Sequence, residues 1–276
     1  MRKILLLLGI CVMFCTGCEY TSNALTNKGL EKLYKRDYNS AITYFSRSIA
    51  IHGKNASAYY NRGLAKYCLQ DRKGALADFD KALEIQPLFP PAFYNRAEVK
   101  TDLKDYDGAI TDYSMAVTLD PRSGKALYNM GQLKINMKNY AGALGDFTKA
   151  IAAAHDDTEG HTYLTASYIN RALTNYYLQD YPKALADLDS AVILAPNNLE
   201  ALYNIGYMKY QHADYTGAQA AFTRILAIDA KYGVAIFYNG LTDIKLGYKD
   251  IGCGELDKAS RLGVAEAKDT ISKYCR

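Results

Sequence analysis

Apolar residues recur along this chain at the i, i+3, i+4 and i+7 spacing of amphipathic helices, and no stretch has the alternating, β-branched character of strands. A longer period lies over this one. From Tyr59 to Pro87, small, aromatic and proline residues follow a spacing that returns about every 34 positions through most of the sequence. Each unit predicts two helices joined by a short turn such as LQDRK or LKDYD. The chain is therefore expected to be all-α and built from repeated helix pairs.

The clearest unit has Gly63, Ala75, Phe79, Ala82 and Pro87 at positions 8, 20, 24, 27 and 32. This unit resembles the tetratricopeptide repeat, which has small residues at 8, 20 and 27, an aromatic residue at 24 and proline at 32. The resemblance implies an α-solenoid, a right-handed superhelix of antiparallel helix pairs. Small residues would let the helix backbones approach closely, and the proline would end the second helix of each pair.

The period predicts one domain over residues 22–276, with about seven repeats and a capping helix. Seven residues, Thr158 to Leu164, interrupt the period between the fourth and fifth repeats. The match to the pattern loosens in the seventh repeat, where Gly252 replaces alanine at position 20 and Gly254 follows. The expected repeats are 22–55, 56–89, 90–123, 124–157, 165–198, 199–232 and 233–262, and the capping helix is 264–275.

The first 18 residues, MRKILLLLGICVMFCTGC, have a positively charged start, an apolar run and small residues before a cysteine, which is typical of a secretion signal. The end of this segment resembles the lipobox of bacterial lipoproteins. The resemblance implies a signal peptide over residues 1–17, a lipid on Cys18 and a tether that ends at residue 22. Glu19 in place of aspartate favours the outer membrane. The alternative is ordinary signal cleavage, which would leave a soluble periplasmic or secreted protein.

The charge and the motifs of the chain argue against nucleic-acid binding and catalysis. The chain has 33 Lys and Arg against 29 Asp and Glu, and Arg2 and Lys3 would leave with the signal. A nearly neutral mature chain gives little support for nucleic-acid binding. No nucleophile–base pair, phosphate loop or dinucleotide fingerprint is evident, so we expect neither an enzyme nor a cofactor. The segment from His155 to His161, HDDTEGH, is either metal-binding or a solvated acidic connection, and its spacing favours the connection, so no metal is expected.

In the tetratricopeptide repeat family, positions 2, 5, 6, 9, 12 and 13 of the first helices face a concave groove. Position 6 is asparagine in the first six repeats of this chain, and position 5 is mostly tyrosine. Asparagine offers a donor and an acceptor to a peptide backbone, and tyrosine offers rigid contact area. Alternatively, both residues only pack against neighbouring helices. The candidate partner-binding residues are Tyr60, Asn61, Tyr94, Asn95, Lys125, Tyr128, Asn129, Asn170, Tyr203 and Asn204.

One subgroup of the family grips a carboxylate with lysine, asparagine and arginine from three successive repeats. Asn95 and Lys125 match two of its positions, whereas Tyr60, Leu64 and Asn129 replace the other three residues. We therefore do not expect a carboxylate clamp of that type.

Three cysteines remain after the signal: Cys68, Cys253 and Cys275. The closing segment that holds the last two resembles the end of many bacterial tetratricopeptide repeat proteins. If its helices form an antiparallel hairpin about Gly263, Cys253 and Cys275 lie side by side, which favours a disulfide over two free thiols. Cys68 is expected to be free.

The interpretation that follows is a non-enzymatic interaction scaffold, lipid-anchored in the bacterial cell envelope, that binds a partner protein or peptide in its groove. The alternative is a soluble secreted repeat protein that binds a small ligand, a glycan or a peptidoglycan fragment on the tyrosine-rich surface.

Overall fold

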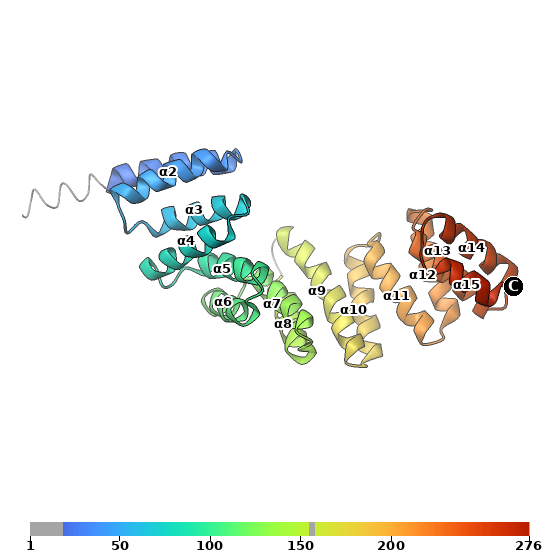
Figure 1. Cartoon of the computed structure of the whole chain (residues 1–276). Helices are drawn as coiled ribbons and strands as arrows, with labels where there is room; N and C mark the ends of the chain where they lie inside the picture. Colours follow the sequence, from blue (N-terminus) through green and yellow to red (C-terminus); the bar gives the residue numbers. More distant parts are fainter. Residues whose placement is uncertain (1–18, 155–157, 276) are drawn as a thin grey trace, which may run out of the picture. The chain divides into compact units, whose positions relative to one another are not determined.

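A computed structural model describes residues 19–154 and 158–275 of the chain, and within these residues all regular structure is helical (Figure 1). The expected signal peptide, Cys18 and the start of the HDDTEGH segment lie outside the described residues. The predicted all-α architecture of antiparallel helix pairs is confirmed. After a helix over residues 19–34 come α2 (Tyr38–Ile51), α3 (Ala56–Cys68), α4 (Arg72–Ile85), α5 (Pro90–Asp102), α6 (Tyr106–Leu119), α7 (Gly124–Asn136), α8 (Tyr140–Ala153), α9 (Thr158–Tyr177), α10 (Tyr181–Leu194), α11 (Leu199–Gln211), α12 (Tyr215–Ile228), α13 (Gly233–Lys245), α14 (Lys249–Arg261) and α15 (Ala267–Tyr274).

Two segments that the sequence set apart from the repeats, residues 19–22 and 158–164, are helical. Residues 19–22, expected as a tether, belong to the first helix. The seven residues that interrupt the period lie in α9, which begins at Thr158 and is 20 residues long. The chain divides into two compact units, of which the first ends at Leu133 and the second begins at Lys134. Each unit is described below by itself.

The turn between the two helices of a repeat has the same construction each time. The residue at position 15 has a positive φ of 60° to 65° in six repeats, and the seventh has Gly247 there with φ 94°. This left-handed residue ends the first helix. The next residue is aspartate or asparagine in the first six repeats, and in Asp71, for example, Oδ1 accepts a hydrogen bond of 2.9 Å from the backbone N of Gly74. That bond caps the second helix, because it satisfies an otherwise unpaired N–H of the first turn.

Small residues at position 8 receive the aromatic ring at position 24. A Cβ added to Gly63 would lie 2.8 Å from Cε1 of Phe79, and one on Gly206 would lie 2.6 Å from Cε1 of Phe222. Both rings are completely buried, as is Ala75 at position 20. The ring can pack directly on the helix backbone only because the glycine has no side chain.

The helices of several repeats are also joined by buried ion pairs, which the sequence pattern did not predict. Arginine at position 7 makes a bidentate salt bridge with aspartate at position 23. In Arg96, for example, Nε lies 2.8 Å from one carboxylate oxygen of Asp112 and Nη2 lies 2.6 Å from the other. Nη1 of Arg96 also donates to Asp80 at 2.7 Å, in the preceding repeat. Each such arginine therefore connects its own two helices and the repeat before it. The pairs are Arg62–Asp78, Arg96–Asp112 and Arg171–Asp187.

The seventh repeat is packed tightly at position 20. A Cβ on Gly252 would collide with the carbonyl oxygen of Gly240, so the two glycines bring α13 and α14 into backbone contact. Glycine in place of alanine at position 20 thus goes with close packing, because the missing methyl group is what permits the close approach. Beyond this pair, α15 covers the end of the second unit, and Cys253 and Cys275 lie at disulfide distance, with Cα atoms 5.7 Å apart. Cys68 is free and exposed.

Candidate functional site

Tyrosine at position 5 and asparagine at position 6 are joined across neighbouring repeats of the first unit. Nδ2 of Asn95 donates to the hydroxyl of Tyr60 at 2.9 Å, and Nδ2 of Asn129 donates to the hydroxyl of Tyr94 at 2.8 Å. In each pair the two residues are 35 positions apart, one more than the period. The asparagine stands at position 6 of one repeat, and the tyrosine stands at position 5 of the repeat before it. These bonds fix the tyrosine rings along the surface of the first helices.

Two other candidate asparagines, Asn61 and Asn170, donate hydrogen bonds within their own helices. Nδ2 of Asn61 and Nδ2 of Asn170 donate to carbonyl oxygens one turn earlier in their own helices, those of Ser57 and Ala166. The repeat before Asn204 has Ile169 at position 5, which offers no polar atom. Asn95 and Asn129 therefore bridge neighbouring repeats in addition to any contact within their own helices.

The amide group of Asn95 is only partly used by the fold. Its Nδ2 donates to the carbonyl oxygen of Pro91 at 2.8 Å as well as to Tyr60, so both amide hydrogens are engaged. A ligand would therefore meet the Oδ1 acceptor and not an amide donor. This acceptor matches a backbone N–H of an extended peptide.

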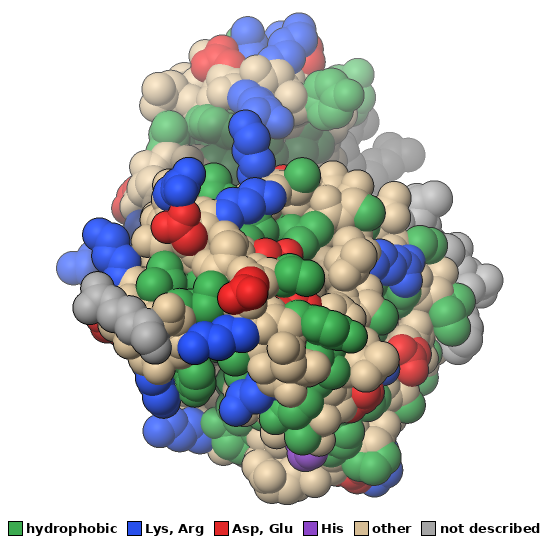
Figure 2. Space-filling view, turned by 90° about the vertical axis from the view of Figure 1, so that its right-hand side faces the viewer, with side chains coloured by type: hydrophobic (Ala, Val, Ile, Leu, Met, Phe, Trp, Pro, Cys, Tyr) green, Lys and Arg blue, Asp and Glu red, His purple; other side chains and the backbone are tan. Residues whose placement is uncertain are grey.

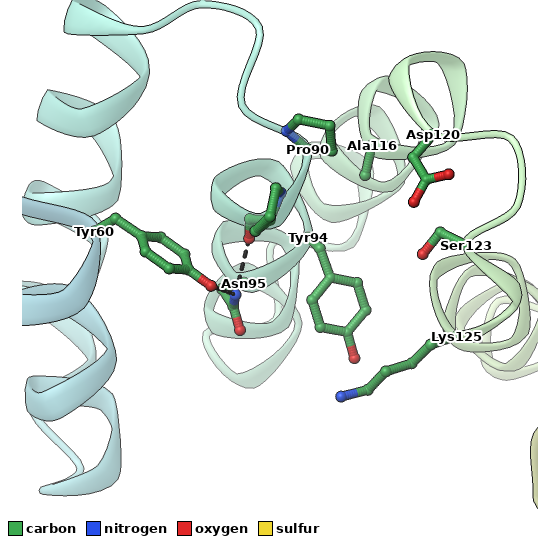
Figure 3. Close-up of a pocket in the computed structure, with 9 residues that line it drawn as sticks. Tyr60, Pro90, Tyr94, Asn95, Ala116, Asp120, Ser123 and Lys125 are labelled. Carbon is green, nitrogen blue, oxygen red and sulfur yellow. Dashed lines mark hydrogen bonds between the residues drawn. The ribbon is translucent and has the colours of Figure 1, made fainter. Parts of the chain in front are cut away.

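A pocket of about 520 Å³ opens beside this pair in the first unit. Figure 3 shows Tyr60 and Asn95 on one side of it, Lys125 and Ser123 on the other, and Tyr94 between them. The pocket brings together four of the candidate residues, two from each of two chemical kinds: aromatic rings and polar groups. It is lined by Tyr60, Pro90, Pro91, Tyr94, Asn95, Ala116, Asp120, Ser123 and Lys125.

Lys125 supplies the positive charge of the pocket. Its Nζ lies 4.9 Å from the centroid of the Tyr94 ring, a cation–π arrangement. Among the described residues, no carboxylate lies within ion-pair distance of this ammonium group. The pocket therefore combines apolar walls with a cation that is available to a ligand.

Tyrosine hydroxyls and carboxylates continue this surface along the first helices. The hydroxyl of Tyr94 donates to Glu98 Oε1 at 2.7 Å, and that of Tyr67 donates to Asp102 Oδ2 at 3.2 Å. Burial, with the charge of Asp102, raises the pKa of Tyr67 to about 12. The Tyr67 phenol therefore remains protonated at neutral pH and donates its hydrogen bond to Asp102. Glu98 at position 9 and Asp102 at position 13 were not among the residues predicted from the sequence, although both positions face the groove in this family.

The second unit carries a cluster of aromatic rings from two of its repeats. The Tyr203 ring stacks on Tyr207 with centroids 6.1 Å apart, and Tyr238 meets Tyr207 edge-on at 5.4 Å. Tyr238 also lies 5.8 Å from Tyr210. Tyr238 stands at position 6, where earlier repeats have asparagine, and its ring lies edge-on to that of Tyr203 with centroids 5.9 Å apart. Only Tyr203 of this cluster was a candidate from sequence.

Tyr128, another candidate, is not among the residues that line the pocket. The hydroxyl of Tyr128 accepts from Gln132 Nε2 at 2.6 Å within α7. No three His, Cys, Asp or Glu side chains gather closely enough to hold a metal ion among the residues that the structure describes. Over the same residues, no helix has both the length and the apolar composition needed to cross a membrane.

The fold and its surface define the class: an α-helical repeat protein that presents an aromatic and polar face on its first helices. Three family models match, all described as tetratricopeptide repeat, over residues 56–89, 90–123 and 169–232. The chain is a tetratricopeptide repeat protein. A comparison with curated proteins gives no match.

Solved structures show the same fold at low sequence identity. The C-terminal part of a repeat protein from Cytophaga hutchinsonii is 17% identical with a TM-score of 0.74, and the match covers 88% of this chain and 98% of that one. PilF of Pseudomonas aeruginosa is 19% identical with a TM-score of 0.63, covering 80% and 99%. YrrB, a repeat protein described as having an unusual peptide-binding site, is 22% identical with a TM-score of 0.58, covering 71% and 97%.

Proposed function

We propose that this protein is a non-enzymatic scaffold that binds an extended segment of a partner protein along the first helices of its repeats. The observation that carries the proposal is the pocket of the first unit. Its Tyr60 and Tyr94 rings offer rigid apolar contact, Asn95 Oδ1 accepts a backbone N–H, and Lys125 attracts an acidic group of the partner.

The geometry suits a peptide better than a compact small molecule. The polar groups of the first unit are spread over the first helices of three repeats, from Tyr60 on α3 through Tyr94 on α5 to Asn129 on α7, and do not converge on one reacting atom. A catalytic site needs unlike groups around a single centre. An extended chain can contact several such groups in turn, and each contact adds to its affinity.

We further propose that the mature protein is lipid-anchored at Cys18 in the bacterial cell envelope, on the outer membrane. The lipobox-like segment ahead of residue 19 supports this placement. PilF, and PilW, which is described as a type IV pilus biogenesis factor and is 18% identical with a TM-score of 0.62, show that this fold occurs in pilus proteins. At such identity they support the class of scaffold and not a shared partner.

The proposal is tested by recovery of partners from detergent-solubilised envelopes. Lys125→Ala is expected to reduce recovery of a protein partner severalfold with little change in the melting temperature, because within residues 19–154 and 158–275 the lysine has a cation–π contact with Tyr94 but no ion pair. Lys73→Ala, an exposed lysine on α4 of the same unit, is the matched control and should leave recovery unchanged. Equal recovery with both variants would show that the pocket is not the binding place.

A second candidate function is binding of a glycan or a peptidoglycan fragment, and the tyrosine cluster of the second unit favours it. Exposed aromatic faces stack on sugar rings, and Tyr207 and Tyr210 are only partly buried. Calorimetric titration with soluble peptidoglycan fragments tests this function. Heat that Tyr207→Ala abolishes would support it, and no heat with the intact chain would remove it.

A further inference from the structure

Positive charge is concentrated in the first repeat. Residues 19–55 contain six Lys and Arg against three Asp and Glu, whereas residues 56–276 contain 25 against 26. The whole positive excess of the chain after residue 18 therefore lies in one repeat. At the other end, α13 to α15 show hydrophobic, basic and acidic side chains interspersed (Figure 2).

Part of this charge lies on one face of the first helix, together with exposed aromatic rings. At about 100° per residue, Tyr20, Lys28, Tyr34 and Lys35 fall within an arc of about 120°. The buried Ser22 lies on the opposite side of the helix, where its hydroxyl meets that of Ser48 in α2 at 2.8 Å. Tyr20 and Tyr34 are 79% and 92% exposed, far more than any other tyrosine described. We call these four residues the N-terminal face.

The charges of this face act on one another. Nζ of Lys35 lies 2.7 Å from Glu31, and this hydrogen bond lowers the pKa of Glu31, with the charges of Lys32 and Lys28 acting in the same direction. One carboxylate thus sits among three lysines. No described carboxylate pairs with Lys28, so the face keeps a net positive charge.

The fold leaves this face uncovered and close to the proposed anchor. The first helix of an inner repeat has a preceding repeat beside it, whereas Tyr20 and Tyr34 on this helix are largely exposed. The helix already includes residue 19, so no tether separates it from Cys18. A lipid on Cys18 would therefore hold the N-terminal face near the bilayer.

We infer that the N-terminal face lies on an anionic lipid bilayer, with Lys28 and Lys35 toward the headgroups and Tyr20 and Tyr34 at the interface. This inference rests on the proposed lipid anchor for its proximity to the membrane. Tyrosine favours the interface because its ring is apolar and its hydroxyl remains hydrated. Basic side chains near anionic lipid each strengthen binding by about fivefold, and the attraction falls off within a Debye length.

Such a surface orients the protein and does not anchor it. Few cations face the bilayer, so their attraction alone would be weak at physiological salt, where the Debye length is about 8 Å. Joined to an acyl anchor, the same attraction fixes the angle of the first repeat. The rest of the chain, which is close to neutral, has no comparable attraction for the headgroups.

The test uses the full chain as its host matures it, bound to vesicles of phosphatidylcholine or of phosphatidylcholine with phosphatidylglycerol. Hydrogen–deuterium exchange is measured over residues 19–55 at about 0.15 M and about 1 M salt. We expect exchange in this segment to slow at least threefold on the anionic vesicles at the lower salt only. The same exchange rate on both kinds of vesicle would overturn the inference.

Two variants make the test specific. Lys28→Gln and Lys35→Gln on the N-terminal face, together with Arg36→Gln in the turn that follows the first helix, should abolish the difference between the vesicles. The control changes Lys73, Lys81 and Lys104 to glutamine. Lys73 matches the unpaired Lys28, Lys81 matches Lys35 because it is paired with a glutamate close by in sequence, and Lys104 matches Arg36 because both stand at position 15. A difference that survives the first set, or that the control set also removes, contradicts the inference.

The proposed lipid anchor on Cys18 is tested separately, by flotation of the protein with neutral vesicles. Without an anchor, the protein would not float with phosphatidylcholine, and that result rejects the lipid-anchor proposal. The N-terminal face would then still be tested by salt-sensitive flotation with the anionic vesicles alone. Absence of that flotation overturns the inference, and its loss in the Lys28, Lys35 and Arg36 variant supports it.

Discussion

Asn95 and Tyr60 hold two neighbouring repeats together through a single hydrogen bond of 2.9 Å on the surface that we propose binds a partner. The asparagine uses its donors within the fold and keeps an acceptor for a ligand. The structural interpretation of the asparagine row therefore holds for this residue, and its role in binding a partner stays a proposal. One amide group positions the tyrosine ring and also contributes to the proposed peptide site.

Loss of this bond is expected to destabilise the protein slightly. Asn95→Ala and Tyr60→Phe should each cost about 1 kcal/mol in urea unfolding, a typical net value for one hydrogen bond. The double variant should cost less than the sum, because either change already removes the bond. Additive costs would show that the two side chains act independently.

The buried arginine of the third repeat is expected to contribute more. Arg96→Met leaves Asp112, whose side chain is 2% exposed, without its two-pronged partner. We expect a loss of about 3 kcal/mol, because a buried carboxylate is left undercompensated, although Lys100 remains 2.8 Å away.

Removing both charges separates the two explanations for that loss. Arg96→Met with Asp112→Leu should recover most of the stability, since an apolar pair of similar volume can replace a buried ion pair. If the double variant is as unstable as Arg96→Met, packing around the arginine stem and not the unpaired carboxylate explains the cost. Urea midpoints of the three proteins decide between them.

The sequence period explains why the helices were predictable and these contacts were not. Small, aromatic and proline residues specify helix packing at fixed positions, and helix pairs followed from them directly. The Asn95–Tyr60 bond follows from an offset of 35 residues that is present in the sequence, but only the structure shows that the two side chains meet. Arg96 has several acidic residues within reach along the chain, and the fold alone selects Asp80 and Asp112.

The seventh repeat replaces this ion pair with groups that respond to pH. Asn239 stands at position 7 and donates to both oxygens of Glu255, at 3.0 and 2.8 Å, while Asp243 replaces the usual lysine at position 11. Burial raises the pKa of Glu255 from 4.5 to about 7, and the neighbouring Asp243 adds to this effect. Protonated Glu255 is thus favoured in the folded protein, which stabilises it below about pH 4.5.

That contribution should be lost as the pH rises from about 4.5 to about 7, because the unfolded chain releases the proton first. The decrease should not exceed about 3 kcal/mol. Glu255→Gln keeps a neutral hydrogen-bonding side chain and is expected to remove this part of the pH dependence. Asp257→Asn, in an exposed pair with Arg261 on the same helix, should leave it in place. An unchanged slope in Glu255→Gln would contradict the assignment.

The turn residues offer a stabilising change. Ala213 has φ 62° and a side chain that makes no compensating polar contact, so Ala213→Gly should stabilise the protein by about 1 kcal/mol. Gly247→Ala, at φ 94°, should do the opposite. Both shifts are measured as changes in the urea midpoint, and a destabilised Ala213→Gly would show that the left-handed turn is not strained.

The central claim, that the first-unit pocket holds a segment of a partner protein, is tested most directly by a photo-crosslinking amino acid placed at Lys125 in living cells. The control carries the same amino acid at Lys73 on α4. We expect a discrete crosslinked species at position 125, containing a peptide of another protein, and none at position 73. Identical crosslinking at both positions, or none at position 125 in cells that express the folded protein, would contradict the account.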